Sequence, residues 1–254
     1  MAGWTDLDQG IRVRQSRRYS MNSVLLLHAE HWVVVDPGIL PSEIDDIAGV
    51  VREVAPAAVT LIFTHGHWDH VLGRSWWPEA ETIAHDAFVG VIRAKAKSID
   101  HEADALASAA GETWPRPFSA YGIDHAVSGL HFRMVGPWRL VFRSAPGHCA
   151  DQINVHLPEH GVLIAADMMS DLEIPDLHQP PDTYRQSLDA LLPLAHGGAI
   201  QTLVPGHGAI ARGREAVLER FEGDLDYLDT IEHAAQDAVR AGRAVESVIE
   251  ELRS

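Results

Sequence analysis

The stretch Thr64-His65-Gly66-His67-Trp68-Asp69-His70 decides the fold of this chain. It directly follows the apolar run Ala58-Val59-Thr60-Leu61-Ile62-Phe63, which predicts a buried strand that ends in the histidine loop. Alternate residues of an extended segment point to the same side, so the first two histidines and the aspartate can converge while the last histidine turns to a neighbouring position. Imidazoles and a carboxylate at this density are typical of a metal site, and they suit two ions better than one.

Three later segments repeat the same design, a predicted strand that runs into a potential ligand. Residues 140–144 run into Pro146-Gly147-His148, residues 161–166 into Asp167, and residues 201–204 into Pro205-Gly206-His207-Gly208. Glycines beside both histidines let the backbone turn tightly where a ligand must approach an ion. With the loop, these segments supply the candidate metal ligands His65, His67, Asp69, His70, His148, Asp167 and His207.

Length and composition suit one sizeable globular domain. The chain has 254 residues, of which 46% are hydrophobic and 22% are charged, so neither disorder nor a fibrous repeat is indicated. The formal net charge of −16 repels phosphate backbones, and we therefore expect a small-molecule substrate and no nucleic-acid partner. The arginines of residues 12–18 are interpreted as part of a solvated edge strand.

Cys149 is the only cysteine, so no intrachain disulfide can form and no oxidising compartment is needed. We expect it to be a small buried side chain, because neighbours in an extended segment point apart and His148 is expected to face the site. The start of the sequence has no basic and then apolar secretion signal, and every apolar stretch is too short to span a bilayer. These patterns predict a cytoplasmic protein that does not engage a membrane.

The remaining pattern alternates strands and helices. Strands are expected at residues 20–29, 31–35, 81–84, 125–135 and 137–143, and helices at residues 41–54, 86–110 and from 214 onward. Residues 111–122 contain two prolines among several aromatic side chains and predict a loop or lid. Asp36 stands at a predicted strand end, where it can orient a metal ligand or simply form a turn before Pro37-Gly38.

Over residues 20–210 these motifs resemble those of metallo-β-lactamase-fold hydrolases. The resemblance rests on the His-x-His-x-Asp-His loop, the later His, Asp and His in that order, and Asp36. It implies an α/β fold, a four-layer αβ/βα sandwich in a single domain over residues 1–254, with a C-terminal helical segment over about residues 214–254 and metals at one edge between two sheets.

The resemblance also implies a dinuclear centre of two Zn2+ per chain, with iron or manganese as alternatives. In that assignment a first ion is held by three histidines, a second ion by Asp69 and two further histidines, and Asp167 bridges them. The first set is His65, His67 and His148, and the histidines of the second set are His70 and His207.

The chemistry that the resemblance implies is hydrolysis of an ester, lactone, thioester or amide. A hydroxide between the metals would attack the carbonyl, and Asp69 would hold it and carry its proton to the leaving group. The family's β-lactamases typically lack an aspartate bridge, so Asp167 argues against antibiotics as principal substrates. Glyoxalase II shares the site and Trp68, but residues 214–254 are acidic where that enzyme has a basic cluster. A lactonase-like or esterase-like hydrolase is the interpretation that remains.

Three alternatives stay open. Persulfide dioxygenases resemble this fold and bind one iron through residues matching His65, His148 and Asp167. Metal-dependent phosphodiesterases that process transfer RNA share the same ligand set, although the acidic charge of this chain argues against nucleic acid. A non-catalytic scaffold stabilised by metal is the third.

Loops outside the ligand strands are expected to line a largely apolar substrate pocket. The candidates are Trp68, Trp76, Trp77, residues 114–121, Met168, Met169, Ile174, His178 and Tyr184. His178 or Tyr184 can donate a hydrogen bond to a substrate carbonyl, or instead serve as a loop cap or as core packing. The apolar residues of the helix from Arg214 onward have the spacing to pack on the sandwich, and we leave open that this helix contacts a partner subunit in a homodimer.

Overall fold

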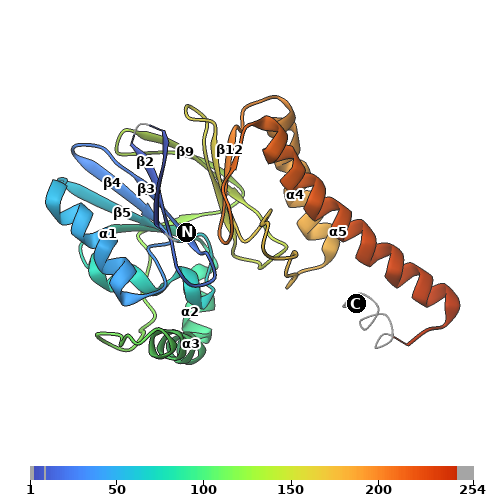
Figure 1. Cartoon of the computed structure of the whole chain (residues 1–254), viewed down its shortest axis with the longest axis horizontal. Coiled ribbons are helices and arrows are strands. Elements are labelled where there is room, and N and C mark those ends of the chain that lie inside the picture. Colours follow the sequence, from blue (N-terminus) through green and yellow to red (C-terminus); the bar gives the residue numbers. More distant parts are fainter. Residues whose placement is uncertain (1–2, 9, 245–254) are drawn as a thin grey trace.

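The computed structural model describes residues 3–8 and 10–244. Within that part of the chain two β-sheets lie face to face, and helices cover both outer faces (Figure 1). The first sheet contains, in spatial order, β1 (Gly3–Asp8), β2 (Ile11–Gln15), β3 (Asn22–Leu26), β4 (His31–Val35), β5 (Ala58–Ile62), β6 (Glu81–His85) and β7 (His125–Val127). The second contains β13 (Ala211–Arg212), β12 (Thr202–Pro205), β11 (Val162–Ala166), β10 (Ile153–Leu157), β9 (Trp138–Ser144) and β8 (Leu130–Val135).

Helices form the two outer layers, so the predicted four-layer sandwich is confirmed. The first sheet is covered by α1 (Pro41–Val54), α2 (Phe88–Ala94) and α3 (Ala96–Ala109), and the second by α4 (Pro181–His196) and α5 (Arg214–Ala241) (Figure 1). In β4, Val33 and Val35 pack between the sheets while Trp32 and Val34 pack under the helices. Because both faces of this strand are covered, its sequence is continuously apolar rather than alternating.

The structure corrects three of the predicted elements. Residues 86–110 form two helices, because α2 ends at Ala94 and α3 begins at Ala96, with Lys95 between them. Residues 125–135 form two strands in different sheets, separated at Gly129, whose φ of 62° suits a residue without a side chain. The arginine-rich β2 is not an edge strand, because β1 pairs with it on the outside. The hairpin of β3 and β4 and the helix α1 are as predicted.

The helix α5 begins at Arg214 as predicted and runs beyond the sandwich (Figure 1). Val217, Phe221 and Leu228 are buried against α4 and the second sheet. The prediction extended this segment to residue 254, of which residues 245–254 lie outside the described part of the chain. None of the helices described combines the length and apolar character needed to cross a membrane.

Tyr184 and Asp224 join α4 to α5 in a buried polar contact. The Tyr184 hydroxyl donates to Asp224 Oδ2 at 2.6 Å, and the Met169 backbone N–H donates to the same oxygen at 2.8 Å. Burial raises the pKa of the Asp224 carboxyl to about 6, against the lowering effect of both hydrogen bonds. Desolvation of the carboxylate therefore outweighs its hydrogen bonds.

Because of this contact, we expect the unfolding free energy of the protein to fall as pH rises. The folded protein binds the Asp224 proton more tightly than the unfolded chain, so the stabilisation is complete below pH 4 and is lost as pH rises through 6. We compare the unfolding free energy of Asp224→Asn with that of the native protein. The difference in favour of the variant is expected to be about 1 kcal/mol larger at pH 8 than at pH 5. Urea unfolding across this range measures the difference, with the exposed Asp226→Asn as control. A difference that is constant with pH would contradict this assignment.

Candidate metal centre

The histidine loop leaves β5 at the carboxyl end of the strand and turns into a short 3-10 helix, Trp68–His70. Its start is held by Asp36, which follows the neighbouring parallel strand β4. Asp36 Oδ1 accepts the Thr64 backbone N–H at 2.8 Å and Oδ2 accepts the Thr64 hydroxyl at 2.6 Å. Because these groups are buried, the carboxylate fixes where the loop begins.

The other candidate ligands come from strand ends of the second sheet, as the sequence predicted. His148 follows β9, Asp167 follows β11 and His207 follows β12. The two sheets are joined at this edge, because the Asn22 backbone N–H donates to the Gly206 carbonyl at 2.7 Å. Residues far apart in the sequence are thereby brought to one seam between the sheets.

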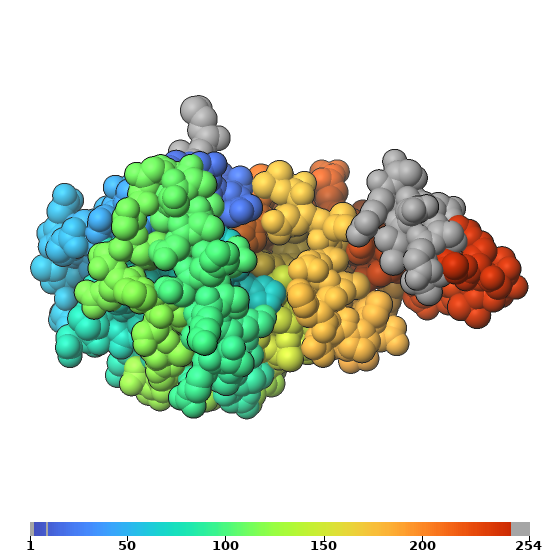
Figure 2. Space-filling model, turned by 90° about the horizontal axis from the view of Figure 1, so that it is seen from below, coloured from blue at the N-terminus to red at the C-terminus, as the bar shows by residue number. Residues whose placement is uncertain are grey.

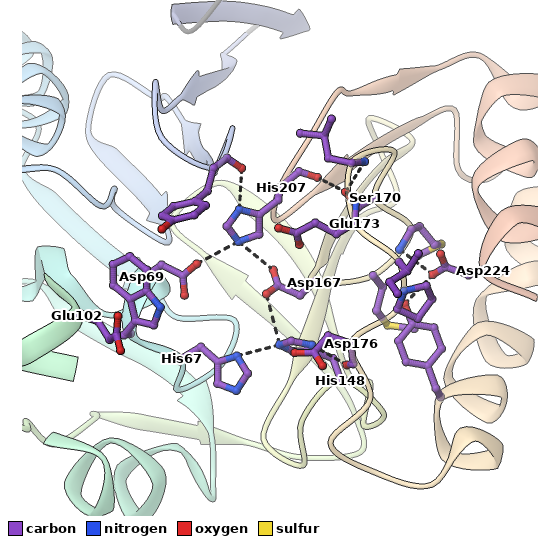
Figure 3. Close-up of a pocket in the computed structure, with 18 residues that line it drawn as sticks. His67, Asp69, Glu102, His148, Asp167, Ser170, Glu173, Asp176, His207 and Asp224 are labelled. Carbon is purple, nitrogen blue, oxygen red and sulfur yellow. Dashed lines mark hydrogen bonds and ion pairs between the residues drawn. The ribbon is translucent and has the colours of Figure 1, made fainter. Parts of the chain in front are cut away.

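Asp167 lies between two groups of side chains at this seam (Figure 3). Its Oδ2 is 3.3 Å from His148 Nε2 and 3.5 Å from His65 Nε2. Its Oδ1 is 3.2 Å from His70 Nε2 and 3.7 Å from His207 Nε2. One carboxylate thus offers a different oxygen to each group.

The two remaining candidates complete these groups. His67 Nδ1 lies 2.9 Å from His148 Nε2, and Asp69 Oδ2 lies 3.1 Å from His207 Nε2 and 3.8 Å from His70 Nε2. All seven predicted ligands are therefore within one small volume. Donor atoms of His65, His70 and Asp167 also lie within 4.8 Å of one another, so the two groups adjoin.

The chemistry of this donor set fits metal ions. Among the described residues, the buried atoms His65 Nε2, His70 Nε2 and Asp167 Oδ1 have no hydrogen-bond partner. Buried polar atoms are nearly always paired, so three orphaned atoms that face one another are the signature of a group that belongs between them. A cation fits, because imidazole nitrogens and carboxylate oxygens are its preferred donors.

Other contacts fix the orientation of the imidazoles. His70 Nδ1 is 2.8 Å from Asp36 Oδ2, His148 Nδ1 is 3.0 Å from the Asp176 carbonyl, and His207 Nδ1 is 2.9 Å from the Tyr19 carbonyl. Each of these acceptors favours a proton on Nδ1 and leaves Nε2 to face the centre. Such contacts to the distal nitrogen are typical of metal-binding histidines.

The family model of the metallo-beta-lactamase superfamily matches residues 17–207. The chain belongs to this superfamily. No curated protein matches the sequence significantly.

Solved structures with the same fold are distant in sequence. The sec-alkylsulfatase Pisa1 from Pseudomonas sp. aligns with a TM-score of 0.74 and 15% identity over 95% of this chain. The chain spans only 44% of that protein. The DIM-1 metallo-beta-lactamase aligns with a TM-score of 0.61 and 16% identity, covering 88% of this chain and 96% of its own. The mono-zinc form of FIM-1 from Pseudomonas aeruginosa aligns with 0.59 and 18%, covering 89% and 94%. At these identities the likeness establishes the fold alone.

The histidine pKa values differ between the two groups of candidate ligands. Burial lowers the pKa of His65 to about 4 and that of His67 to about 3, so both rings are neutral at pH 7. Burial would also lower the pKa of His207, but the Asp167 charge and the hydrogen bond to Asp69 raise it to about 9. A cation at the second group must displace this proton, so its affinity rises with pH.

Sequence analysis missed two residues of the centre. The Cys149 sulfur lies within 4.8 Å of donor nitrogens of His65, His67 and His148, and thus is a further candidate donor, although it is buried as predicted. The rule that neighbours point apart fails here because this segment is a turn and not a strand. Asp151 is also buried, and its Oδ2 accepts the Gly66 backbone N–H at 2.9 Å. It ties the turn after β9 to the histidine loop.

Two glycines allow the close approaches that build the centre. A Cβ at position 206 would lie 2.1 Å from Asp167 Oδ1, so any side chain there would displace the carboxylate. Gly147 has φ of 144°, and a Cβ there would lie 2.6 Å from the Tyr184 Cα. In both segments the glycine of the Pro-Gly-His pattern is therefore needed for close packing as well as for a tight turn of the backbone.

A cavity of about 640 Å3 opens over the centre, and Trp68, Met168, Met169 and Ile174 line it as predicted. In Figure 2 it lies between the green atoms of α3 and the gold atoms of the segment after β11. Tyr184 reaches its wall, but the hydroxyl is donated to Asp224, so core packing replaces the predicted role of a substrate donor.

The other predicted wall residues lie elsewhere. The His178 ring packs 5.4 Å from that of His67, and its Nε2 is 3.1 Å from the Asp176 carboxylate. Trp76, Trp77 and residues 114–121 are not part of the metal cavity, because they pack on the helical side of the first sheet. Residues 111–122 form no helix or strand, as expected, but they border a separate cavity of about 400 Å3 and are not a lid over the centre.

Asp36 provides a test of how the centre is oriented. Asp36 Oδ2 accepts from both the Thr64 hydroxyl and His70 Nδ1. In Asp36→Asn an amide NH2 group, which cannot accept a hydrogen bond, replaces one oxygen, so we expect the affinity for zinc to fall about 10- to 100-fold. Asparagine also tolerates the positive φ of 46° at this position, so the backbone is preserved. Competition with a chromophoric chelator measures the affinity, and the exposed Asp104→Asn on α3 is the control. Equal affinities in both variants would show that Asp36 does not orient a ligand.

Proposed function

We propose that this chain is a hydrolase that uses two divalent metal ions. The observation that carries the proposal is the convergence of three buried ligand atoms that make no hydrogen bond, His65 Nε2, His70 Nε2 and Asp167 Oδ1, at one seam. The first ion would be held by His65, His67 and His148, and the second by Asp69, His70 and His207. Asp167 would be shared, because its two oxygens face different groups.

Zinc is the metal that we propose, because neutral imidazoles and carboxylates are its usual ligands, and iron or manganese can occupy the same donors. When bound, such a pair of ions supplies an activated water as nucleophile and stabilises negative charge on the attacked group. Asp167 is suited to the shared position, since a carboxylate offsets the repulsion between two dications.

Asp69 is the residue that we assign to proton transfer. It lines the cavity, and the charges of His70 and His207 hold its pKa at about 2 despite burial, so it is an anion at pH 7. An anionic carboxylate beside the attacked bond can accept the proton of the water and deliver it to the leaving group. Asp69 Oδ2 lies 3.1 Å from His207 Nε2, so both side chains would face the second ion.

An ester, lactone, thioester or amide is the proposed substrate, in a lactonase-like or esterase-like reaction. The cavity volume is in the range of small-molecule sites, and Trp68, Met168 and Ile174 give it an apolar wall. The sulfatase and β-lactamases of the same fold act on different bonds, so the fold leaves the substrate class open. The wall residues are what favour a moderately hydrophobic acyl compound.

Metal removal is the first test of this proposal. Elemental mass spectrometry of the purified chain is expected to find two zinc ions per chain. Hydrolysis of an ester, lactone, thioester, phosphodiester and β-lactam panel is expected to be lost on chelation and recovered when zinc is restored. One iron per chain, oxygen uptake with a persulfide and no hydrolysis would replace the hydrolase with a dioxygenase. Two metals with no turnover of any class would indicate a scaffold.

A second test separates Asp69 from the other ligands. We expect Asp69→Asn to lower kcat by about 10²- to 10⁴-fold, because the amide cannot accept a proton. Metal content is measured alongside, since His65, His67 and His148 are unchanged and the first ion should remain bound. A variant that keeps both the first ion and full kcat would exclude proton transfer through this residue.

A further inference from the structure

The cavity over the candidate metal centre is lined by several acidic side chains. Among the described residues that line it, none is a lysine or an arginine. Glu102, Glu173, Asp176 and the buried Asp224 line it in addition to the ligand carboxylates. An anionic substrate would therefore meet carboxylates on the cavity wall, and only the metal ions of the proposed function would supply positive charge to hold it.

Two arginines outside this lining already form ion pairs. Arg220 lies 3.1 Å from Asp171, and Arg17 lies 3.7 Å from Glu43 and also pairs with Glu112. Lys95 is near enough to His67 to help lower the pKa of that ring, but it does not line the cavity. None of these side chains offers a bidentate anion site to a bound molecule.

Glu173 is the carboxylate best placed to bind substrate. In Figure 3 it extends toward the centre beside His207 and Asp167. Its backbone N–H is held by Ser170, while its carboxylate has no hydrogen bond or ion pair with a described residue. Asp176, by contrast, already faces His178 at 3.1 Å. Glu173 thus has an unused negative charge directed into the cavity.

Aromatic rings line the same cavity. Tyr19 and Trp68 form an edge-to-face pair with centroids 6.0 Å apart, and the Tyr19 side chain is largely exposed. The electron-rich face of such rings attracts ammonium groups, most strongly for tryptophan. Carboxylates and aromatic faces around one space are the combination that binds organic cations.

We propose that the substrate of this hydrolase carries an ammonium group, bound in the cavity by Glu173 with Trp68 and Tyr19. The proposal rests on the proposed function and adds the substrate class to it. The ammonium group takes no part in bond breaking. Water adds to the carbonyl carbon, the ester C–O bond breaks, and an acid and an alcohol or amino alcohol leave. Sulfate esters, phosphodiesters and β-lactam carboxylates, which are anions, are disfavoured.

A matched substrate pair tests the inference. Acetylcholine and 3,3-dimethylbutyl acetate differ only in a charged nitrogen that replaces a neutral carbon. With the metal-loaded protein we expect kcat/KM to be about tenfold higher for the cationic ester, as one ion pair plus one cation–π contact supplies. We expect Glu173→Gln to lower kcat/KM for the choline ester about threefold more than for the isostere, because the cation–π contact remains. Glu53→Gln, exposed on α1 and away from the cavity, is the matched control.

The outcomes separate this inference from the proposed function. A ratio near one in the native protein, or a ratio that Glu173→Gln leaves unchanged, would overturn the inference while hydrolysis itself stands. Equal losses for both esters would also overturn it, because Glu173 would then act on the charge of the metal centre and not on the substrate. Absence of hydrolysis with every metal counts against the proposed function. Calorimetric binding of choline against 3,3-dimethylbutan-1-ol then decides the inference without turnover, and equal affinities would overturn it.

Discussion

The Asp167 carboxylate, nine-tenths buried between the strand ends of two sheets, is the constraint on which the rest of the structure depends. A buried charge is costly unless groups of opposite or adaptable charge surround it. Here imidazoles from both sheets surround it, which ties the packing of the sandwich to the composition of the centre. Gly206 leaves the space that the carboxylate occupies, and its carbonyl accepts from Asn22 of the opposite sheet. Asp167 can therefore not move without disturbing the contact between the sheets.

Irregular segments hold the centre as firmly as the strands do. The Tyr19 and Asp176 carbonyls each contact the distal nitrogen of one imidazole, although neither residue lies in a helix or strand. The segment after β11 thus has two functions. It orients His148 through Asp176, and it carries Glu173 into the cavity. Orientation of a ligand and recognition of the substrate are linked because the same short stretch of backbone supplies both.

Sequence reasoning was accurate where local physics dominates. The helix from Pro41 and the strand before the histidine loop were predicted because proline at a helix start and a continuous apolar run are strong local signals. It was inaccurate where a choice depends on distant partners. Residues 125–135 contain an unbroken strand pattern, yet the chain crosses from one sheet to the other at Gly129. The aromatic residues of the 111–122 loop looked like walls of the substrate cavity, but their apolar faces pack on the helical layer of the first sheet.

The sequence by itself determined the fold and the set of candidate ligands, because the spaced histidines and aspartates and the apolar runs before them form short motifs that resemble those of a known family. Only the tertiary structure decided the distances of the other six candidates from Asp167, which carbonyls orient the imidazoles, and that Cys149 lies beside the first group. It also decided that Glu173 faces the cavity and that the residues described around it include no lysine or arginine. The physical reason is that these properties depend on distances between segments up to nearly two hundred residues apart, such as Tyr19 and His207, and local periodicity contains no record of such distances.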